Sequence, residues 1–374
     1  MEAATIAIDG SMGEGGGQVL RSALALSMAL GKPFHMSGIR GKRPKPGLKR
    51  QHLTCVRAAQ AICGAEVSGD AMHSAELTFI PGTLRPGDYE FHVGTGGSVT
   101  LVLQALLPPL LTASALSRIT VTGGTHVPHA PPFEFMERTL FPCLERMGAK
   151  LAVVMSRVGY MDVGGGAVSV EIVPAGPLLP FAGKALGAFE QAGAAIYCHN
   201  LPPDVAEREE AVLLAGSGTT SRPGICRIRR IDGSSGGVSC TGAGNAVLVS
   251  LFYEGGEIVL GEIGWRGRSA ETVARHAVRR ATDYMCSGAQ IERHLADQLL
   301  VPMALAGGGS FIAETVTPHT KTCLDVITLF TGLKAEFTSG DGKGVRITLG
   351  AAPGDNKGKI HDIRKRIEHA GPSQ

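Results

Sequence analysis

The 374-residue sequence is poor in aromatic side chains, which make up 5% of it and include a single tryptophan. Its eight cysteines form no CxxC pair and no cluster with histidines at zinc spacing, which argues against a zinc site and favours a reduced compartment. No run of about 18 apolar residues suggests a membrane span. The N-terminus lacks a basic stretch followed by an apolar one. We therefore expect a cytoplasmic protein without membrane association.

Acidic residues are missing from one long stretch of the chain. Between residues 15 and 65 there is no Asp or Glu, although the whole chain has a formal net charge of only +3. The same stretch carries nine lysines and arginines. A patch of one sign suits a polyanion such as a nucleotide or nucleic acid. The alternative is a solvated basic face without a ligand.

A glycine-rich loop, GSMGEGGGQVLRS at residues 10–22, lacks the lysine of a P-loop and is not a complete GxGxxG motif. It follows the strand-like TIAID and precedes a helix-like run, so its backbone N–H groups lie at a helix start, which favours an anion. Arg21 on that helix can offer its guanidinium to phosphate oxygens. Glu14 is negative like phosphate and can act through a divalent cation that bridges the two. The alternative is a turn and helix cap with no ligand.

A second basic segment, IRGKRPKPGLKRQH at residues 39–52, forms a loop stiffened by prolines between a strand and a helix. Arg40 and Arg43 leave the end of the strand, and Gln51 and His52 lie in the first turn of the helix. Cations held in place in this way suit an anionic ligand. A solvated loop without a ligand is the alternative.

A histidine marks the start of another helix. His319 lies in TPHTKTCLDV, where a strand ends and an amphipathic helix begins, and Thr320 is expected to help cap that helix. A helix N-terminus disfavours imidazolium and stabilises phosphate, which predicts a neutral, nucleophilic His319 near pH 7. In another helix, Asp297 and Gln298 open an otherwise apolar run. The alternatives are a structural histidine and ordinary polar residues in a first helical turn.

One supersecondary unit occurs three times in the chain, with the order helix, strand, helix and strand pair. Two copies fall within residues 1–182 and the third within residues 289–353. Residues 183–288 read as a small inserted α+β domain with an acidic and a basic helix, and residues 354–374 as a polar, basic tail. We expect an α/β (α+β) fold with a large domain of three βαβαββ-type units and this insert.

The motifs GSMGEGGGQVLRS, IRGKRPKPGLKRQHL, GGTHVPHAPP, HLADQLLVPMALAG and PHTKT together resemble those of the RNA 3′-terminal phosphate cyclase family, over nearly the whole chain. The resemblance implies units similar to the C-terminal domain of translation initiation factor 3. It also implies a ligase reaction in which ATP adenylates a histidine, AMP passes to an RNA 3′-phosphate, and the 2′-hydroxyl closes a 2′,3′-cyclic phosphodiester. The expected partners are ATP, RNA with a 3′-phosphate and a divalent metal, Mg or Mn.

Carried over to this sequence, the resemblance implies that His319 is adenylated and that Glu14 binds the metal. The remaining implied site residues are phosphate-binding arginines and polar or apolar residues of the nucleotide pocket: Arg21, Arg40, Arg43, Gln18, Gln51, His52, Gln104, Pro131, His294, Leu295, Ala296, Asp297 and Gln298. Pro131 is expected on one face of adenine. The family has a tyrosine on the other face, where this chain has His294, whose ring buries less area.

Three rival functions fit parts of the pattern. Non-catalytic relatives of the cyclases act in ribosome assembly and lack the nucleophile, whereas His319, Glu14 and Arg21 are all present here. An enolpyruvyl transferase is also built from repeated units, but it needs basic residues spread over two comparable domains. A pure RNA-binding module fits poorly with the low aromatic content. The sequence therefore favours an enzyme.

Overall fold

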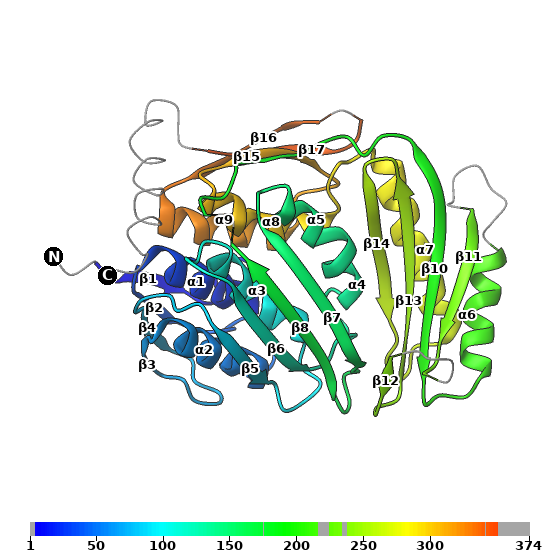
Figure 1. Ribbon diagram of the computed structural model, residues 1–374, viewed down its shortest axis with the longest axis horizontal. Coiled ribbons are helices and arrows are strands. Elements are labelled where there is room, and N and C mark those ends of the chain that lie inside the picture. Colours follow the sequence, from blue (N-terminus) through cyan, green and yellow to red (C-terminus); the bar gives the residue numbers. More distant parts are fainter. Residues whose placement is uncertain (1–3, 175, 216–223, 234–237, 341, 351–374) are drawn as a thin grey trace.

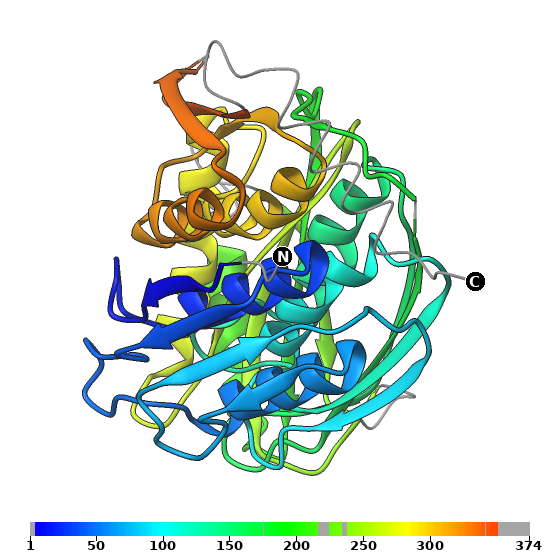
Figure 2. The same cartoon turned by 90° about the vertical axis from the view of Figure 1, so that its left-hand side faces the viewer.

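The computed structural model describes residues 4–174, 176–215, 224–233, 238–340 and 342–350, so the tail predicted at 354–374 lies outside the described residues. The described chain has a mixed α/β fold with four sheets. Helices α1, α2, α3, α8 and α9 pack against one another in the interior, and three of the sheets lie around them (Figures 1 and 2). The fourth sheet, with α6 and α7, lies at one end of the molecule (Figure 1).

The first sheet has the strand order β1-β2-β4-β3, with β1 and β2 parallel and the other pairs antiparallel. Helices α1 and α2 both end at a glycine in the left-handed region, at φ 63°, which stops each helix without strain. The elements of this part are β1 (Ile6–Asp9), α1 (Gly17–Leu30), β2 (Phe34–Ser37), α2 (Arg50–Cys63), β3 (Glu66–Ser68) and β4 (Leu77–Ile80).

The second sheet has five strands in the order β12-β7-β8-β6-β5. Its predicted second helix is present but changes to a π-helical turn in its middle. The elements are β5 (Asp88–His92), α3 (Val99–Leu110), β6 (Ser117–Gly123), α4 (Phe133–Phe135), the π-helical turn η1 (Met136–Leu140), α5 (Phe141–Glu145), β7 (Lys150–Val158), β8 (Gly166–Val173) and β12 (Ser239–Cys240).

The third sheet has the order β16-β17-β15-β9 and comes mostly from the C-terminal part of the chain. Helix α9 has Thr317 at its N-cap and Pro318 at its first position, a combination that fixes the start of the helix. The elements are β9 (Phe181–Ala182), α8 (Arg293–Leu305), β15 (Gly309–Ala313), α9 (Pro318–Thr331), β16 (Lys334–Ser339) and β17 (Val345–Gly350).

The fourth sheet has the order β11-β10-β13-β14, and together with α6 and α7 it encloses a smaller hydrophobic cluster of its own. Its central strand, β10, was not predicted from the sequence, because its small residues hide the alternation of apolar and polar positions. The elements are β10 (Phe189–His199), α6 (Asp204–Ala215), β11 (Ile225–Ile231), β13 (Gly244–Tyr253), β14 (Gly256–Ile263) and α7 (Ala270–Ser287).

The main hydrophobic core runs through the interior helices. Side chains of α1 such as Val19, Ala23 and Leu24 are fully buried, and most of the helix is inaccessible to solvent. This packing fixes the N-terminal ends of α1 and α9 next to each other. Among the described helices, none combines the length and apolar character needed to cross a membrane.

Candidate active site

A cavity of about 530 Å³ lies where α1, α3, α8 and α9 meet β14 and the segment 128–132. This volume suits a nucleotide-sized ligand. Eight of the residues implied by the sequence motifs line it: Gln18, Arg21, Gln104, Pro131, His294, Asp297, Gln298 and His319. Helices from distant parts of the chain thus bring together the residues that the motifs singled out.

The glycine-rich loop ends at the N-terminus of α1 and is held on two sides. Gly13, at φ 56°, lies so close to Thr322 of α9 that a Cβ atom there would clash with the threonine hydroxyl. A Cβ atom at Gly16 would lie 2.8 Å from a guanidinium nitrogen of Arg43, and one at Gly17 would clash with Nε2 of His52. The glycines therefore let α9, Arg43 and His52 approach the start of α1 directly.

Arg21 is buried, with 8% of its surface exposed. Its Nε donates to Oε1 of Gln104 and one terminal nitrogen donates to Oε1 of Gln18, each at 2.9 Å. No carboxylate lies within 4 Å of this guanidinium in the part of the chain that the structure describes. A buried cation with only amide partners favours an anion in the adjoining cavity.

His319 occupies the first turn of α9, and its Nε2 lies 3.0 Å from Oε2 of Glu14. The same carboxylate oxygen lies 3.4 Å from Arg43. Burial lowers the pKa of His319, opposed by Glu14 and reinforced by nearby cations, so the ring is neutral near pH 7. The N-cap of α9 is Thr317, whose hydroxyl accepts the Thr320 N–H at 3.0 Å. The Thr320 hydroxyl lies 3.0 Å from that of Thr317, so Thr320 takes part in the cap.

The basic loop before α2 supplies two kinds of support. Arg40 braces the loop from within, since Nη1 donates to the carbonyl oxygens of Lys45 and Gly47 at 2.7 and 3.0 Å. Burial, with the charges of Arg21, Arg40 and Lys49, lowers the pKa of His52 to about 3, so its imidazole is neutral. Its Nδ1 accepts the Lys49 N–H at 3.2 Å, which leaves the proton on Nε2, facing the start of α1.

Gln51 supports the site indirectly, through a hydrogen bond to the start of α3. Its Oε1 accepts the backbone N–H of Ser98 at 2.8 Å, and Ser98 caps α3, the helix that carries Gln104. Gln51 does not line the cavity. The structure therefore gives it the position of a brace between α2 and α3.

Pro131 and His294 also line the cavity. Helix α8 begins at Arg293, four residues before Asp297, so Asp297 and Gln298 lie in its second turn and do not open it as expected. Burial raises the pKa of Asp297 to about 8, so its carboxyl carries a proton at pH 7.

Leu295 and Ala296 are fully buried in the hydrophobic core and do not line the cavity. The resemblance assigns both residues to the nucleotide pocket, and their side chains belong to the core on which the cavity-lining part of α8 rests. The helix turns these two positions toward the interior while it turns His294, Asp297 and Gln298 toward the cavity.

The described residues contain no group of three or more His, Cys, Asp or Glu side chains able to hold a metal ion. Glu14 is 26% exposed at the side chain, and within the described part of the chain it belongs to no such group. A single carboxylate fits Mg²⁺ only in the mode in which substrate phosphates and water complete its coordination.

The sequence reasoning missed several residues of this region. Trp265 and Arg268, from the loop after β14, line the cavity, and Arg268 stacks on the Trp265 ring at 3.4 Å from its centroid. The signal available was the sole tryptophan inside the run WRGR. His126 and Glu134 were also missed; they form a buried pair at 2.9 Å outside this cavity.

Comparison with known proteins places the chain in one family. The family model described as RNA 3′-terminal phosphate cyclase matches residues 12–337. A protein of Koribacter versatilis named RNA 3′-terminal phosphate cyclase is 44% identical over 333 residues, covering 89% of this chain and 92% of that protein. Proteins of the same name from Ectopseudomonas mendocina and Salmonella typhimurium are each 42% identical, covering 92% and 87% of this chain and 98% and 93% of their own length. The chain therefore belongs to the RNA 3′-terminal phosphate cyclase family.

Proposed function

We propose that this chain is an ATP-dependent enzyme that converts the 3′-terminal phosphate of RNA into a 2′,3′-cyclic phosphodiester. The observation that carries the proposal is that one cavity is lined both by a neutral His319 and by the buried Arg21, whose guanidinium has amide partners and no carboxylate partner among the described residues. A nucleophile and an unpaired cation at one cavity are what attack on a phosphate ester requires. The family membership supports the same activity.

In the first step, a ring nitrogen of His319 attacks the α-phosphorus of ATP. The bond from that phosphorus to the bridging oxygen breaks, pyrophosphate leaves, and AMP is joined to the histidine. In the neutral ring one nitrogen carries the proton and the other attacks with its free lone pair. Glu14 lies 3.0 Å from Nε2 and can accept the ring proton, when that proton lies on Nε2, as the bond from the other nitrogen to phosphorus forms, which leaves the ring neutral. The N-terminus of α9 stabilises the negative phosphate next to His319.

In the second step, an oxygen of the RNA 3′-phosphate attacks the phosphorus of the histidine-linked AMP, and the phosphorus–nitrogen bond breaks. In the third step, the 2′-hydroxyl attacks the 3′-phosphorus and AMP leaves. A free phosphate monoester has no good leaving group, and the attached AMP supplies one. Covalent catalysis therefore divides one difficult condensation into easier displacements.

In this proposal the phosphates and the adenine of ATP contact different sets of residues. Phosphates lie toward the start of α1, where Arg21, Arg43 and the Nε2–H of His52 face them, while Arg40 braces the loop that carries Arg43. Adenine lies between Pro131 and His294. The other proposed nucleotide-binding residues are Gln18, Gln51, Gln104, Leu295, Ala296, Asp297 and Gln298, with Gln51, Leu295 and Ala296 acting through the scaffold. Glu14 would hold a divalent cation, which supplies Lewis-acid charge against phosphate oxygens.

We also propose that the large part of the chain consists of three copies of one unit, in residues 1–182 and 289–353, and that residues 183–288 are an insert. Each of the three sheets around the interior helices has helices packed on one side, which supports this division. The separate hydrophobic cluster of β10, β13, α6 and α7 supports a distinct insert.

The test is incubation of the purified protein with a divalent cation and ATP labelled at the α-phosphate, without RNA. We expect label on the protein that is lost in mild acid and survives alkali, as a histidine phosphoramidate does. His319→Ala should take no label. His92→Ala is the matched control, because His92 also contacts a glutamate, Glu90 at 3.8 Å, but lies exposed on β5.

RNA ending in a 3′-phosphate should then become resistant to phosphatase, and an RNA whose last ribose lacks the 2′-hydroxyl should stop as the adenylate. A folded wild-type protein that takes no label would contradict the covalent mechanism. Retained RNA binding in such a protein would favour the non-catalytic, RNA-associated alternative.

A further inference from the structure

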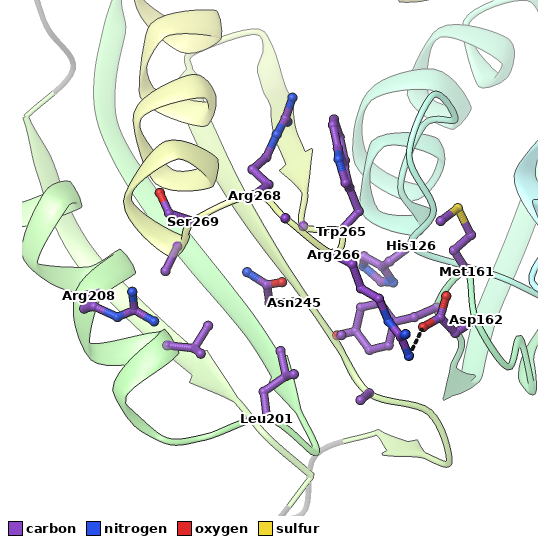
Figure 3. Close-up of a pocket in the computed structure, with 17 residues that line it drawn as sticks. His126, Met161, Asp162, Leu201, Arg208, Asn245, Trp265, Arg266, Arg268 and Ser269 are labelled. Carbon is purple, nitrogen blue, oxygen red and sulfur yellow. Dashed lines mark ion pairs between the residues drawn. The ribbon is translucent and has the colours of Figure 1, made fainter.

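A second cavity, of about 480 Å³, adjoins the first. It lies between the turn after β7, the N-terminal part of α6, the start of β13 and the loop that joins β14 to α7 (Figure 3). Trp265 and Arg268 line both cavities. The two spaces are therefore neighbours on either side of one aromatic–guanidinium stack.

The loop at residues 264–269 turns its side chains in two directions. Trp265 and Arg268 extend the same way from the backbone, while Arg266 extends the opposite way toward Asp162 (Figure 3). Arg268 also pairs with Glu262, which lines the first cavity only. The planar stack of Arg268 on Trp265 offers the kind of surface on which a nucleobase packs.

Two arginines of the second cavity, Arg208 and Arg266, form their ion pairs at the protein surface, where a ligand can reach them from solvent. Arg266 is 93% exposed at the side chain and pairs with Asp162 at 3.3 Å. Arg208 of α6 pairs with Asp204 at 3.0 Å and with Glu271 at 3.4 Å. Exposed ion pairs of this type contribute little, so phosphate groups can replace the carboxylates at small cost.

We propose that this second cavity binds the 3′-terminal nucleotides of the RNA substrate. A base packs near the Trp265–Arg268 stack, backbone phosphates contact Arg208 and Arg266, and the terminal phosphate extends into the first cavity toward His319. The inference rests on the proposed function, since it places the acceptor strand next to the adenylated histidine. Single-stranded RNA fits because it offers a base and a phosphate at each step, which matches an aromatic stack flanked by arginines.

The test is the double charge reversal Arg208→Glu/Arg266→Glu, with Arg275→Glu/Arg279→Glu as the matched control. The control pair lies on α7 in exposed positions and lines neither cavity, and it changes the charge by the same amount. Binding of a fluorescein-labelled, 3′-phosphorylated single-stranded RNA is measured over a salt series. We expect the Kd of the Arg208/Arg266 variant to rise at least tenfold. Its salt slope should fall by about 0.7 for each RNA phosphate that the variant no longer binds.

Trp265, the sole tryptophan of the chain, gives a local second signal. RNA should quench its fluorescence in the wild type and in the control variant, and much less in the Arg208/Arg266 variant at the same RNA concentration. Unchanged RNA affinity in the Arg208/Arg266 variant, or no quenching of Trp265 by bound RNA, would overturn the proposal.

Self-adenylylation without RNA separates this proposal from the proposed function. Transfer of AMP from protein to RNA should fall far more in the Arg208/Arg266 variant than labelling of the protein by ATP. If the wild type binds RNA through these arginines but is not labelled by ATP, the RNA site is supported and the covalent mechanism is contradicted. A variant that takes AMP and transfers it to RNA at the wild-type rate and concentration dependence would remove the RNA site and leave the mechanism.

Discussion

In the described part of the chain, two close histidine–glutamate pairs of nearly equal length lie in very different surroundings. His319 and Glu14 lie 3.0 Å apart, with 39% and 26% of their side chains exposed. His126 and Glu134 lie 2.9 Å apart, with 0% and 3% exposed. The first pair borders the nucleotide-sized cavity through His319, and the second lies between β6, α4 and the central strand β10.

The two pairs differ most in how many of their side-chain nitrogen and oxygen atoms have hydrogen-bond partners. In the buried pair, Nδ1 of His126 bonds to the Thr125 hydroxyl at 2.9 Å, and the second oxygen of Glu134 accepts the Tyr197 hydroxyl. Burial raises the pKa of Glu134, but the charge and hydrogen bond of His126 and the bond from Tyr197 outweigh it, so the net pKa is lowered. The His319 pair keeps an exposed face. His126 also lines a cavity, the second one, but its side chain is fully buried and both of its ring nitrogens have hydrogen-bond partners. A short contact alone therefore does not mark a reactive histidine, whereas an exposed ring such as that of His319, with 39% of the side chain accessible, is open to attack a ligand.

The largest effect should come from His319→Ala. Loss of the proposed nucleophile should reduce self-adenylylation by at least about 10⁴-fold. The free energy of unfolding should change by only about 0.5 kcal/mol, because the residue is half-exposed. Labelling with α-labelled ATP and a urea titration check the two parts. Labelling of this variant at the wild-type level would contradict the claim that His319 is the nucleophile.

His126→Ala should lower the free energy of unfolding strongly and leave self-adenylylation of the folded protein intact. It leaves the carboxyl group of Glu134 buried without its hydrogen-bond partner on His126, so we expect a loss of about 1–3 kcal/mol in the free energy of unfolding, measured by urea titration. Glu134→Gln, which retains polar groups without the charge, should cost less. If folded His126→Ala protein at low temperature took no label from ATP, the buried pair would have a direct part in the chemistry.

Glu14→Gln tests the other partner of the cavity pair. The amide keeps the size of the side chain but loses the charge that would hold a cation and accept a proton, so we expect about a hundredfold slower adenylylation, or about 2.7 kcal/mol. Half-saturation by the divalent cation should shift to higher concentration. An unchanged rate and cation dependence would show that Glu14 only neighbours the histidine.

The pH responses of the two pairs should differ in position. Because the pKa of His319 is lowered, the rate of adenylylation should be flat near pH 7–8 and fall only below pH 6.5, as the ring gains a proton. The pKa of Glu134 is also lowered, so its contribution to stability is present above the ordinary value of 4.5 and is lost as pH falls through the folded value. A pH–rate profile and urea titrations at each pH measure both.

The smallest effect should come from Asp297→Asn, a buried acid with no ion pair within 4 Å among the described residues. Burial raises its pKa to about 8, so it is protonated at pH 7 and an amide replaces it closely. We expect less than a twofold change in ATP affinity at pH 7. Between pH 7 and 9 the wild type should lose affinity as Asp297 ionises, and the variant should not. Equal pH dependence in the two proteins would contradict the raised pKa of Asp297.

Much of the site could be predicted from sequence because its residues sit at the ends of strongly patterned elements. Periodicity and terminal glycines predict α1, α2 and α9, and these put Arg21, His52 and His319 where they are found. The start of α8 and the strand β10 were misjudged, because Glu292 as a cap and a strand of small residues give weak local signals.

The buried His126–Glu134 pair could not be predicted, because it depends on Tyr197, which lies 63 residues from Glu134 on a strand that the sequence did not reveal. Trp265 and Arg268 belong to a loop without periodicity, and only the folded chain brings them to both cavities. Local sequence patterns predict single helices and strands. Contacts such as that between Glu134 and Tyr197 of β10 join distant segments of the chain and become visible only in the tertiary fold.

The most direct test of the account is to locate the nucleotide on the protein. Wild-type protein is incubated with ATP and a divalent cation, digested at alkaline pH, and its peptides are analysed by mass spectrometry. The account predicts AMP on a single histidine, His319, and on no peptide that contains His126. AMP on His126, on another histidine or on a lysine would contradict the assignment of His319 as the nucleophile.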